Sequence, residues 1–147
     1  MMYVVIDNSG SMRDSSKTAI AAGLFMIFRR HAVDKEKITF YKWDHEVSEI
    51  TSPRELSFAG NLEEQPIIDF ISKKTPSPVI LVGDGIFSRN IARVINKTGS
   101  AYLAVGCDCN MDELERMIGE NNVFSWADCI TCFEVVNSRL MANGVEQ

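Results

Sequence analysis

The amino-acid sequence predicts an α/β fold, a three-layer αβα sandwich built around a mostly parallel six-stranded sheet. Short apolar segments rich in β-branched residues alternate along the chain with segments whose apolar residues recur at helical spacing. The strand-like segments are apolar almost throughout, which is typical of strands buried on both faces of a parallel sheet. We therefore expect helices to cover both faces of that sheet.

Six segments are predicted to be strands. In chain order they are Met2–Ile6, Ile38–Trp43, Val47–Ile50, Val79–Val82, Ala101–Val105 and Asn122–Trp126. Only the short link Asp44-His45-Glu46 joins the second segment to the third, which permits a hairpin but no crossover. The third strand should therefore run antiparallel at an edge of the sheet.

Helical patterns fill the intervals between the strands. They cover Lys17–His31, Leu62–Ser72, the turns around Ile91, Val94 and Ile95, a segment with Leu114, Met117 and Ile118 on its apolar face, and a last segment marked by Phe133, Val136 and Leu140. Asn61 with Glu64 resembles a capping box, and Asn110 with Glu113 is expected to cap the fourth helix. There is no repeat or linker, so residues 1–147 are expected to form a single domain.

The composition argues against several classes of function. The chain carries 15 basic and 20 acidic residues, a net charge of -5, and the basic residues are scattered. We therefore expect no nucleic-acid or membrane partner. The longest apolar run, Ala19 to Phe28, falls well short of the roughly 20 residues that span a membrane. The first residues lack a secretory pattern, so we expect a cytoplasmic protein whose four cysteines are thiols or metal ligands.

The loop after the first predicted strand places three oxygen-bearing side chains at alternating positions, Asp7, Ser9 and Ser11. Side chains two residues apart in an extended segment point the same way, so these oxygens can converge. Gly10 allows the backbone to bend between the two serines. A capped turn between a strand and a helix uses the same residue types and is the alternative interpretation.

A second carboxylate follows the strand predicted at Val79–Val82, where Gly83 precedes Asp84. If this strand lies beside the first, both aspartates meet at one edge of the sheet, in the crevice where open α/β sheets bind ligands. Two neighbouring carboxylates repel unless a proton or a cation lies between them. Carboxylates and hydroxyls form a hard oxygen ligand set, which favours Mg²⁺ or Mn²⁺.

The segment Asp7-Asn8-Ser9-Gly10-Ser11-Met12, after an apolar strand, resembles the signature of von Willebrand factor A-type (VWA) domains. Residues 79–85 resemble the second metal segment of that family. The resemblance implies a Rossmann-like sheet of order 3-2-1-4-5-6 with strand 3 antiparallel. It also implies a metal-ion-dependent adhesion site, in which a divalent cation keeps one position open for an acidic side chain of a partner.

One segment departs from the pattern of the VWA family. The family usually places a threonine ligand in a loop before the helix that follows the hairpin, whereas this chain has Asn61 as the best positional match. The side-chain carbonyl of Asn61 could serve as a metal ligand, directly or through water. The equally simple alternative is that Asn61 only caps the helix.

The cysteines occur as two pairs, Cys107 with Cys109 and Cys129 with Cys132. In the predicted fold both pairs lie at the same edge of the sheet, where four thiolates could hold a structural Zn²⁺. The spacing is not that of a standard zinc finger, and Cys132 falls on an apolar helical stripe. Ordinary buried thiols are therefore the alternative to a zinc site.

Two classes of function are compatible with these residues. The first is a non-enzymatic interaction module that uses Mg²⁺ to bind an acidic residue of another protein. Intracellular VWA proteins commonly work beside AAA+ ATPases or in other multiprotein machines, so the resemblance implies that kind of partner. The alternative is a Mg²⁺-dependent hydrolase or phosphotransferase that uses Asp7 or Asp84. For that, Asp44-His45-Glu46 is the available water-activating group, in a hairpin expected to lie far from the metal.

Overall fold

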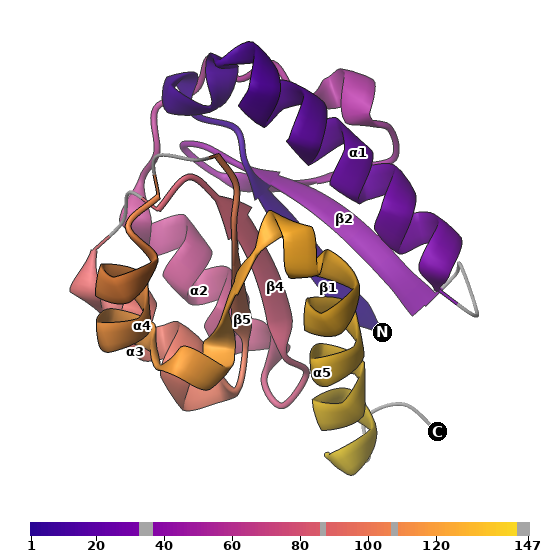
Figure 1. The fold of residues 1–147 in the computed structure, drawn as a ribbon, viewed down its shortest axis with the longest axis vertical. Coiled ribbons are helices and arrows are strands. Elements are labelled where there is room, and N and C mark those ends of the chain that lie inside the picture. Colours follow the sequence, from indigo (N-terminus) through magenta and orange to yellow (C-terminus); the bar gives the residue numbers. More distant parts are fainter. Residues whose placement is uncertain (33–36, 86–87, 107–108, 144–147) are drawn as a thin grey trace.

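A single six-stranded sheet forms the centre of the computed structural model, which describes residues 1–32, 37–85, 88–106 and 109–143. The strand order is β3-β2-β1-β4-β5-β6, and all neighbours run parallel except β2 and β3 (Figure 1). The strands are β1 Met2–Asp7, β2 Ile38–Trp43, β3 Val47–Ile50, β4 Val79–Gly83, β5 Ala101–Ala104 and β6 Val123–Ser125. The predicted α/β class, strand order and antiparallel edge strand are confirmed.

Five α-helices cover the two faces of the sheet. They are α1 Ser15–His31, α2 Glu64–Lys74, α3 Arg89–Thr98, α4 Met111–Ile118 and α5 Cys129–Ala142. Helices α1 and α5 pack on one face, and α2, α3 and α4 pack on the other, as expected for three layers (Figure 1). None of the helices in the described ranges is both long and apolar enough to cross a membrane.

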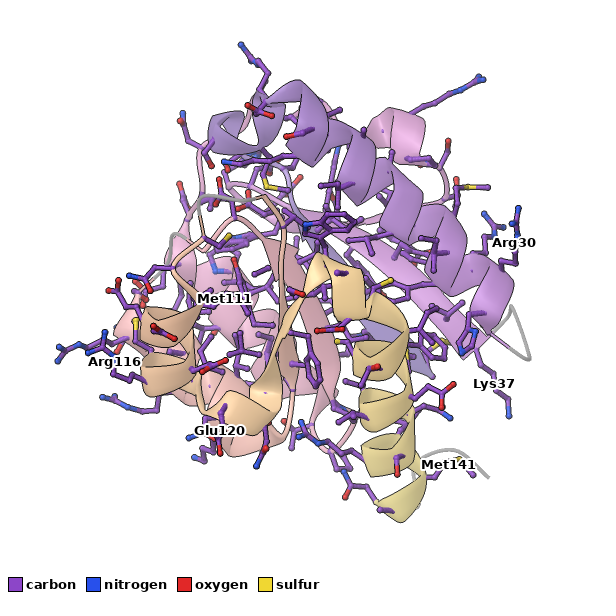
Figure 2. The ribbon with its side chains drawn as sticks, viewed as in Figure 1. Arg30, Lys37, Met111, Arg116, Glu120 and Met141 are labelled. Carbon is purple, nitrogen blue, oxygen red and sulfur yellow. The ribbon has the colours of Figure 1, made fainter. Side chains whose placement is uncertain are left out.

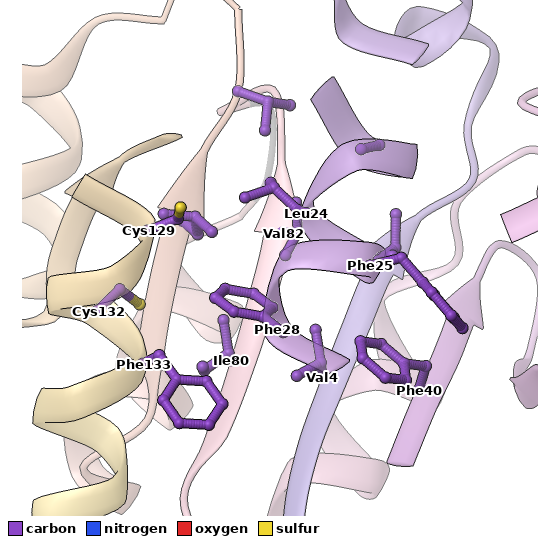
Figure 3. Close-up of a cluster of buried hydrophobic side chains, with 14 of the residues drawn as sticks. Val4, Leu24, Phe25, Phe28, Phe40, Ile80, Val82, Cys129, Cys132 and Phe133 are labelled. Carbon is purple, nitrogen blue, oxygen red and sulfur yellow. The ribbon is translucent and has the colours of Figure 1, made fainter. Parts of the chain in front are cut away.

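Each face of the sheet has its own apolar core. On the face under α1 and α5, Phe25 stacks on Phe40 with ring centroids 4.0 Å apart, and Phe28 lies near Phe133 (Figure 3). The sheet residues of this core alternate with those of the other core, as the two-residue period of a strand requires. Long charged side chains such as Arg30 and Arg116 project from the surface (Figure 2). The central strands are therefore buried on both faces, as their composition predicts.

The capping prediction is right for one helix and wrong for another. Asn110 accepts a hydrogen bond from the backbone N–H of Glu113 at 3.1 Å, as expected. Helix α2, however, begins at Glu64, and its N-cap is Glu63, which makes no side-chain capping bond. The backbone before α2 stays extended because the N–H of Glu63 bonds to the carbonyl oxygen of Asp44. Asn61 therefore lies outside the helix and is not its cap.

Gly60 holds two loops together at the carboxyl edge of the sheet. It pairs with Ser9 in an isolated parallel bridge, donating its N–H to the carbonyl of Asn8 and accepting from the N–H of Gly10. A Cβ atom at Gly60 would overlap the Cβ of Asp44. A residue without a side chain is therefore needed where these loops cross.

We expect Gly60→Ala to lower the free energy of unfolding by about 2 kcal/mol, because overpacking a close backbone contact forces its neighbours apart. The measurement is chemical denaturation of the purified variant. Gly23→Ala is the matched control, since nothing lies within 4 Å of its new methyl group and α1 should gain up to about 1 kcal/mol. Equal stability of the two variants would contradict the close approach.

Candidate metal centre

The candidate site lies where neighbouring strands send their connections to opposite faces of the sheet. Strand β1 leads into α1 on one face, and its neighbour β4 leads toward α3 on the other. Open α/β sheets bind ligands in the crevice at such a point, beyond the carboxyl ends of the strands. Asp7 is the last residue of β1, and Asp84 follows the last residue of β4. The topology therefore delivers both aspartates to the same crevice.

The loop after β1 turns its oxygen atoms toward one another. The N–H of Ser9 donates to Oδ1 of Asp7 at 2.8 Å, which closes a tight turn around the carboxylate. The hydroxyl oxygens of Ser9 and Ser11 are 2.8 Å apart. A 3-10 helix, η1 Gly10–Arg13, follows and buries the side chain of Met12 in the core. Asp7, Ser9 and Ser11 thus form a local oxygen cluster, as the alternating pattern predicts.

Gly83 is the point at which the two strands bring their polar groups together. The position of a Cβ atom on this glycine would be 3.3 Å from Oδ2 of Asp7 and 2.6 Å from the hydroxyl of Tyr102. That hydroxyl accepts a hydrogen bond from the N–H of Gly85 at 2.7 Å, on the far side of Asp84. Any larger residue at position 83 would displace Asp7 or Tyr102 from the crevice.

The proximity of the two carboxylates affects the ionisation of the groups around them. Burial, aided by the charge of Asp84, raises the pKa of Asp7 to about 6, although hydrogen bonds from Ser9 oppose the shift. Burial also raises the pKa of Tyr102 well above its ordinary value, and both Asp7 and Asp84 add to that effect. A buried site with two adjacent acids favours either a proton or a cation between them.

Asp84 is the least satisfied polar side chain of the site. It is 5% exposed, and neither carboxylate oxygen has a hydrogen-bond partner among the described residues. Its neighbour is Lys17 of α1, whose Nζ lies 3.6 Å from Oδ2 of Asp84. Buried carboxylate oxygens without donors are suited to a cation, so the donor set fits a hard metal ion. Lys17 is not among the site residues predicted from the sequence.

Asn8 is a second residue of the site that was not predicted. Its side chain is buried and accepts from the N–H of Phe58 at 2.8 Å while donating to Asp44 at 3.1 Å and to Ser57 at 3.2 Å. Asn8 therefore ties the loop after β1 to the loop before α2 and to the end of β2. These hydrogen bonds hold the loop that carries Ser9 and Ser11 in place.

Asn61 lies next to the oxygen cluster through the backbone rather than through a helix cap. Its neighbour Gly60 bridges to Ser9, which places residue 61 immediately beyond the loop that carries the serines. Asn61 itself is exposed. The structure thus brings Asn61 to the exposed rim of the crevice, beside the loop that carries the serines.

The overall fold matches solved VWA structures over almost the whole chain. A von Willebrand factor type A protein from Catenulispora acidiphila superposes with a TM-score of 0.65 at 14% identity, covering 94% of this chain. The ArnB paralog VWA2 from Sulfolobus acidocaldarius gives 0.59 at 17% identity over 91%. This chain has the VWA fold.

A third VWA structure bears on the metal. Proximal thread matrix protein 1 from the mussel byssus, in a form with a zinc-occupied metal-ion-dependent adhesion site, matches with a TM-score of 0.58 at 13% identity over 94% of this chain. The chain spans less than half the length of these VWA structures, between 41% and 47% of each. Sequence-family profiles and curated proteins give no match.

The cysteines of this chain that lie within the described residues do not come together as a zinc site. Cys109 packs on the α2–α4 face, whereas Cys129 and Cys132 belong to the core under α1 and α5. Cys109 donates to the carbonyl oxygens of Asp84 and Val105, at 3.1 Å each, and burial raises the pKa of Cys132 to about 12. Cys107 lies outside the described residues. The described cysteines therefore give the zinc interpretation no support.

The β2–β3 hairpin lies closer to the crevice than expected. Asp44 accepts a hydrogen bond from Asn8, because β2 is the parallel neighbour of β1 and ends at the same edge. Although burial opposes the shift, bonds from Asn8 and Glu46 lower the pKa of Asp44. His45 pairs with Asp44 at 3.1 Å but its side chain is 70% exposed. The expectation of a remote hairpin is wrong, and Asp44 supports the loop that carries the serines.

The raised pKa of Asp7 predicts how the metal-free protein responds to pH. The pKa is about 6 in the folded state against 3.8 as its ordinary value, so stability falls as pH rises between these two values. Asp7→Asn removes this penalty and should raise the free energy of unfolding by about 2–3 kcal/mol at pH 7.5 in the presence of a chelator. The gain should shrink toward pH 4. Melting curves across this pH range check the prediction.

Asp69→Asn is the control, because Asp69 is exposed on α2 and belongs to no part of the crevice. It should show little change between pH 4 and 7.5. If the stability gain of Asp7→Asn stays constant over this pH range, folding does not disfavour the charged form of Asp7, and the prediction is wrong.

Proposed function

We propose that the chain is a VWA-type protein-interaction module that binds a divalent cation and uses it to engage an acidic residue of a partner protein. The observation that carries the proposal is the convergence of two buried carboxylates with the buried hydroxyl of Ser9 and the exposed hydroxyl of Ser11 at the carboxyl edge of β1 and β4. Asp7, Ser9, Ser11 and Asp84 would hold the cation. Asn61 at the rim would take the place of the usual threonine.

The chemistry of these ligands favours Mg²⁺ or Mn²⁺. All five side chains offer oxygen, and only two of them are carboxylates, so the charge of the cation is not over-neutralised. Within the described ranges no three His, Cys, Asp or Glu side chains form a metal-binding group, so the hydroxyls have to complete the set. Hydroxyls are weak ligands, and a cation held by them keeps a strong affinity for a further carboxylate. The bound cation would thereby supply an electrophilic anchor for the partner's acidic side chain.

The geometry supports a binding role better than the hydrolase or phosphotransferase alternative. A hydrolase needs a group that activates water beside the metal. The Asp44–His45 pair is poorly suited to activating water at the metal. Asp44 already accepts a hydrogen bond from Asn8, and the side chain of His45 lies largely in solvent. No other feature of the described crevice favours turnover. We therefore propose that the protein is not an enzyme.

The likeness to VWA proteins also suggests the setting in which this module acts. We propose a cytoplasmic role within a multiprotein machine, with an AAA+ ATPase as the kind of partner that the VWA resemblance implies. The net charge of -5 without a basic cluster supports a protein partner rather than a nucleic acid. The acidic contact residue would lie on the partner.

Metal titration tests the ligand set. Asp7→Ala should abolish Mn²⁺ binding measured by isothermal titration calorimetry, because it removes the carboxylate around which Ser9 and Ser11 are arranged. Asp84→Ala should weaken binding less, since water can occupy the space of the lost carboxylate. Asp69→Ala is the control that makes the same charge change on the exposed surface of α2. A Mn²⁺ affinity that Asp7→Ala leaves unchanged would rule out the site.

Metal-dependent capture tests the interaction itself. The tagged protein is incubated with extract of its source cells in Mg²⁺, and the bound proteins are then eluted with a chelator. We expect a specific protein in the chelator eluate of the wild type and none with Asp7→Ala. The contact is mapped by substituting the acidic residues of that protein one at a time. Retention by both forms, or the absence of a sensitive acidic residue, would contradict a metal-bridged contact.

A further inference from the structure

Lys17 occupies an unusual position in α1. It falls on the stripe of this helix that faces the sheet, in line with Ala21, Leu24 and Phe28, which are all buried. Lys17 is itself only 9% exposed. A buried lysine is rare unless its charge is paired, because removing an ammonium group from water is unfavourable. The buried side of the helix therefore carries a cation that needs a specific environment.

The environment of Lys17 is the candidate metal centre. Its Nζ lies 3.6 Å from Oδ2 of Asp84 and donates to the carbonyl oxygen of Ser11 at 3.4 Å. These two contacts connect α1 to both segments that carry the proposed ligands. The side chain of Asp84 in that pair is only 1% exposed. The pair is therefore shielded from water, where charges interact more strongly than on a surface.

We propose that Lys17 is an internal counter-ion that holds Asp84 in the metal-free protein and lowers the affinity of the centre for a divalent cation. This inference rests on the proposed function. A divalent ion bound by Asp84 would lie within a few ångströms of the ammonium group, and the two positive charges repel. Metal binding then requires Lys17 to move away or to tolerate that repulsion. In both cases the lysine weakens the metal site.

The charges of the site explain why such a lysine would be useful. Two carboxylates balance one divalent cation, and Lys17 leaves the loaded centre with one excess positive charge. An acidic side chain of the partner restores neutrality, so partner and metal reinforce each other's binding. The module would then hold its metal firmly only in the complex. Lys17 thus acts as a positioning residue for Asp84 and as the residue that sets the metal affinity.

Mn²⁺ titration of Lys17→Met provides the first test. Methionine keeps most of the length of the side chain and removes the charge, so the Mn²⁺ affinity should rise at least about fivefold. Lys17→Arg retains the charge and should bind Mn²⁺ no more tightly than the wild type. Lys73→Met, at the exposed end of α2 away from the crevice, controls for the change in net charge. An unchanged or weaker affinity in Lys17→Met would overturn the inference.

Thermal melting in chelator provides a second test that needs no metal. Lys17→Met should lower the melting temperature because it leaves the Asp84 charge buried without its partner. The same substitution in an Asp84→Asn background should lower it much less. Equal losses in both backgrounds would show that Lys17 is not the counter-ion of Asp84. Lys17→Gln, which keeps a polar end, is measured in parallel in case the methionine variant fails to fold.

The two tests separate this inference from the proposed function. If the wild type binds Mn²⁺ through Asp7 and Lys17→Met binds no more tightly, the inference fails while the function stands. If neither protein binds Mn²⁺, the proposed function fails, and the melting comparison still decides whether Lys17 and Asp84 form a pair. Binding by Lys17→Met alone would support the inference and show that the lysine blocks the empty centre.

Discussion

The burial of two carboxylates at one edge of a parallel sheet is the constraint on which this structure depends. Asp7 is the last residue of β1, and Asp84 directly follows β4. Because β1 and β4 are parallel neighbours, both carboxylates lie at the same edge of the sheet. Charged groups are unfavourable in such a place, so the surroundings have to offset them. Ser9 does so by hydrogen bonding to Asp7, and Lys17 does so by charge at Asp84. The negative charge of the site is therefore only partly compensated, and a bound cation would stabilise it.

Other residues at the carboxyl edge of the sheet hold in place the loop that carries Ser9 and Ser11. Asn8 uses its amide group to bond to three different residues, and Gly60 adds a strand-like backbone contact to Ser9. Cys109 adds a further bond, to the carbonyl of Asp84. These residues contribute rigidity rather than ligands. A rigid loop favours one ligand geometry, which is what discrimination between cations requires.

The sequence could predict the parts of the structure that follow from local pattern or from sheet geometry. Apolar runs revealed the strands, the short link revealed the hairpin, and the alternation of Asp7, Ser9 and Ser11 revealed the loop. The prediction that Asn61 caps the helix is wrong. The hydrogen bond from the N–H of Glu63 to the distant carbonyl oxygen of Asp44 keeps this segment extended, which overrides the local preference of Asn for a helix cap. Lys17 was missed although its spacing from Ala21 and Leu24 places it on the buried stripe of α1. A charged residue on such a stripe indicates a buried partner, but only the tertiary structure reveals that the partner is Asp84.

The stripe also explains how one helix serves both the fold and the site. Helix α1 packs on the sheet through Phe25, which stacks on Phe40 of β2, and on α5 through Phe28, which lies near Phe133. The base of Lys17 is therefore held firmly while its ammonium group reaches the crevice. A lysine on a loose loop would move away from an incoming cation at little cost. A lysine on a packed helix can move only through its own side-chain torsions. The proposed resistance to metal binding would therefore be limited, and one additional negative charge would overcome it. That is the behaviour expected of a centre that binds its metal tightly only together with a partner.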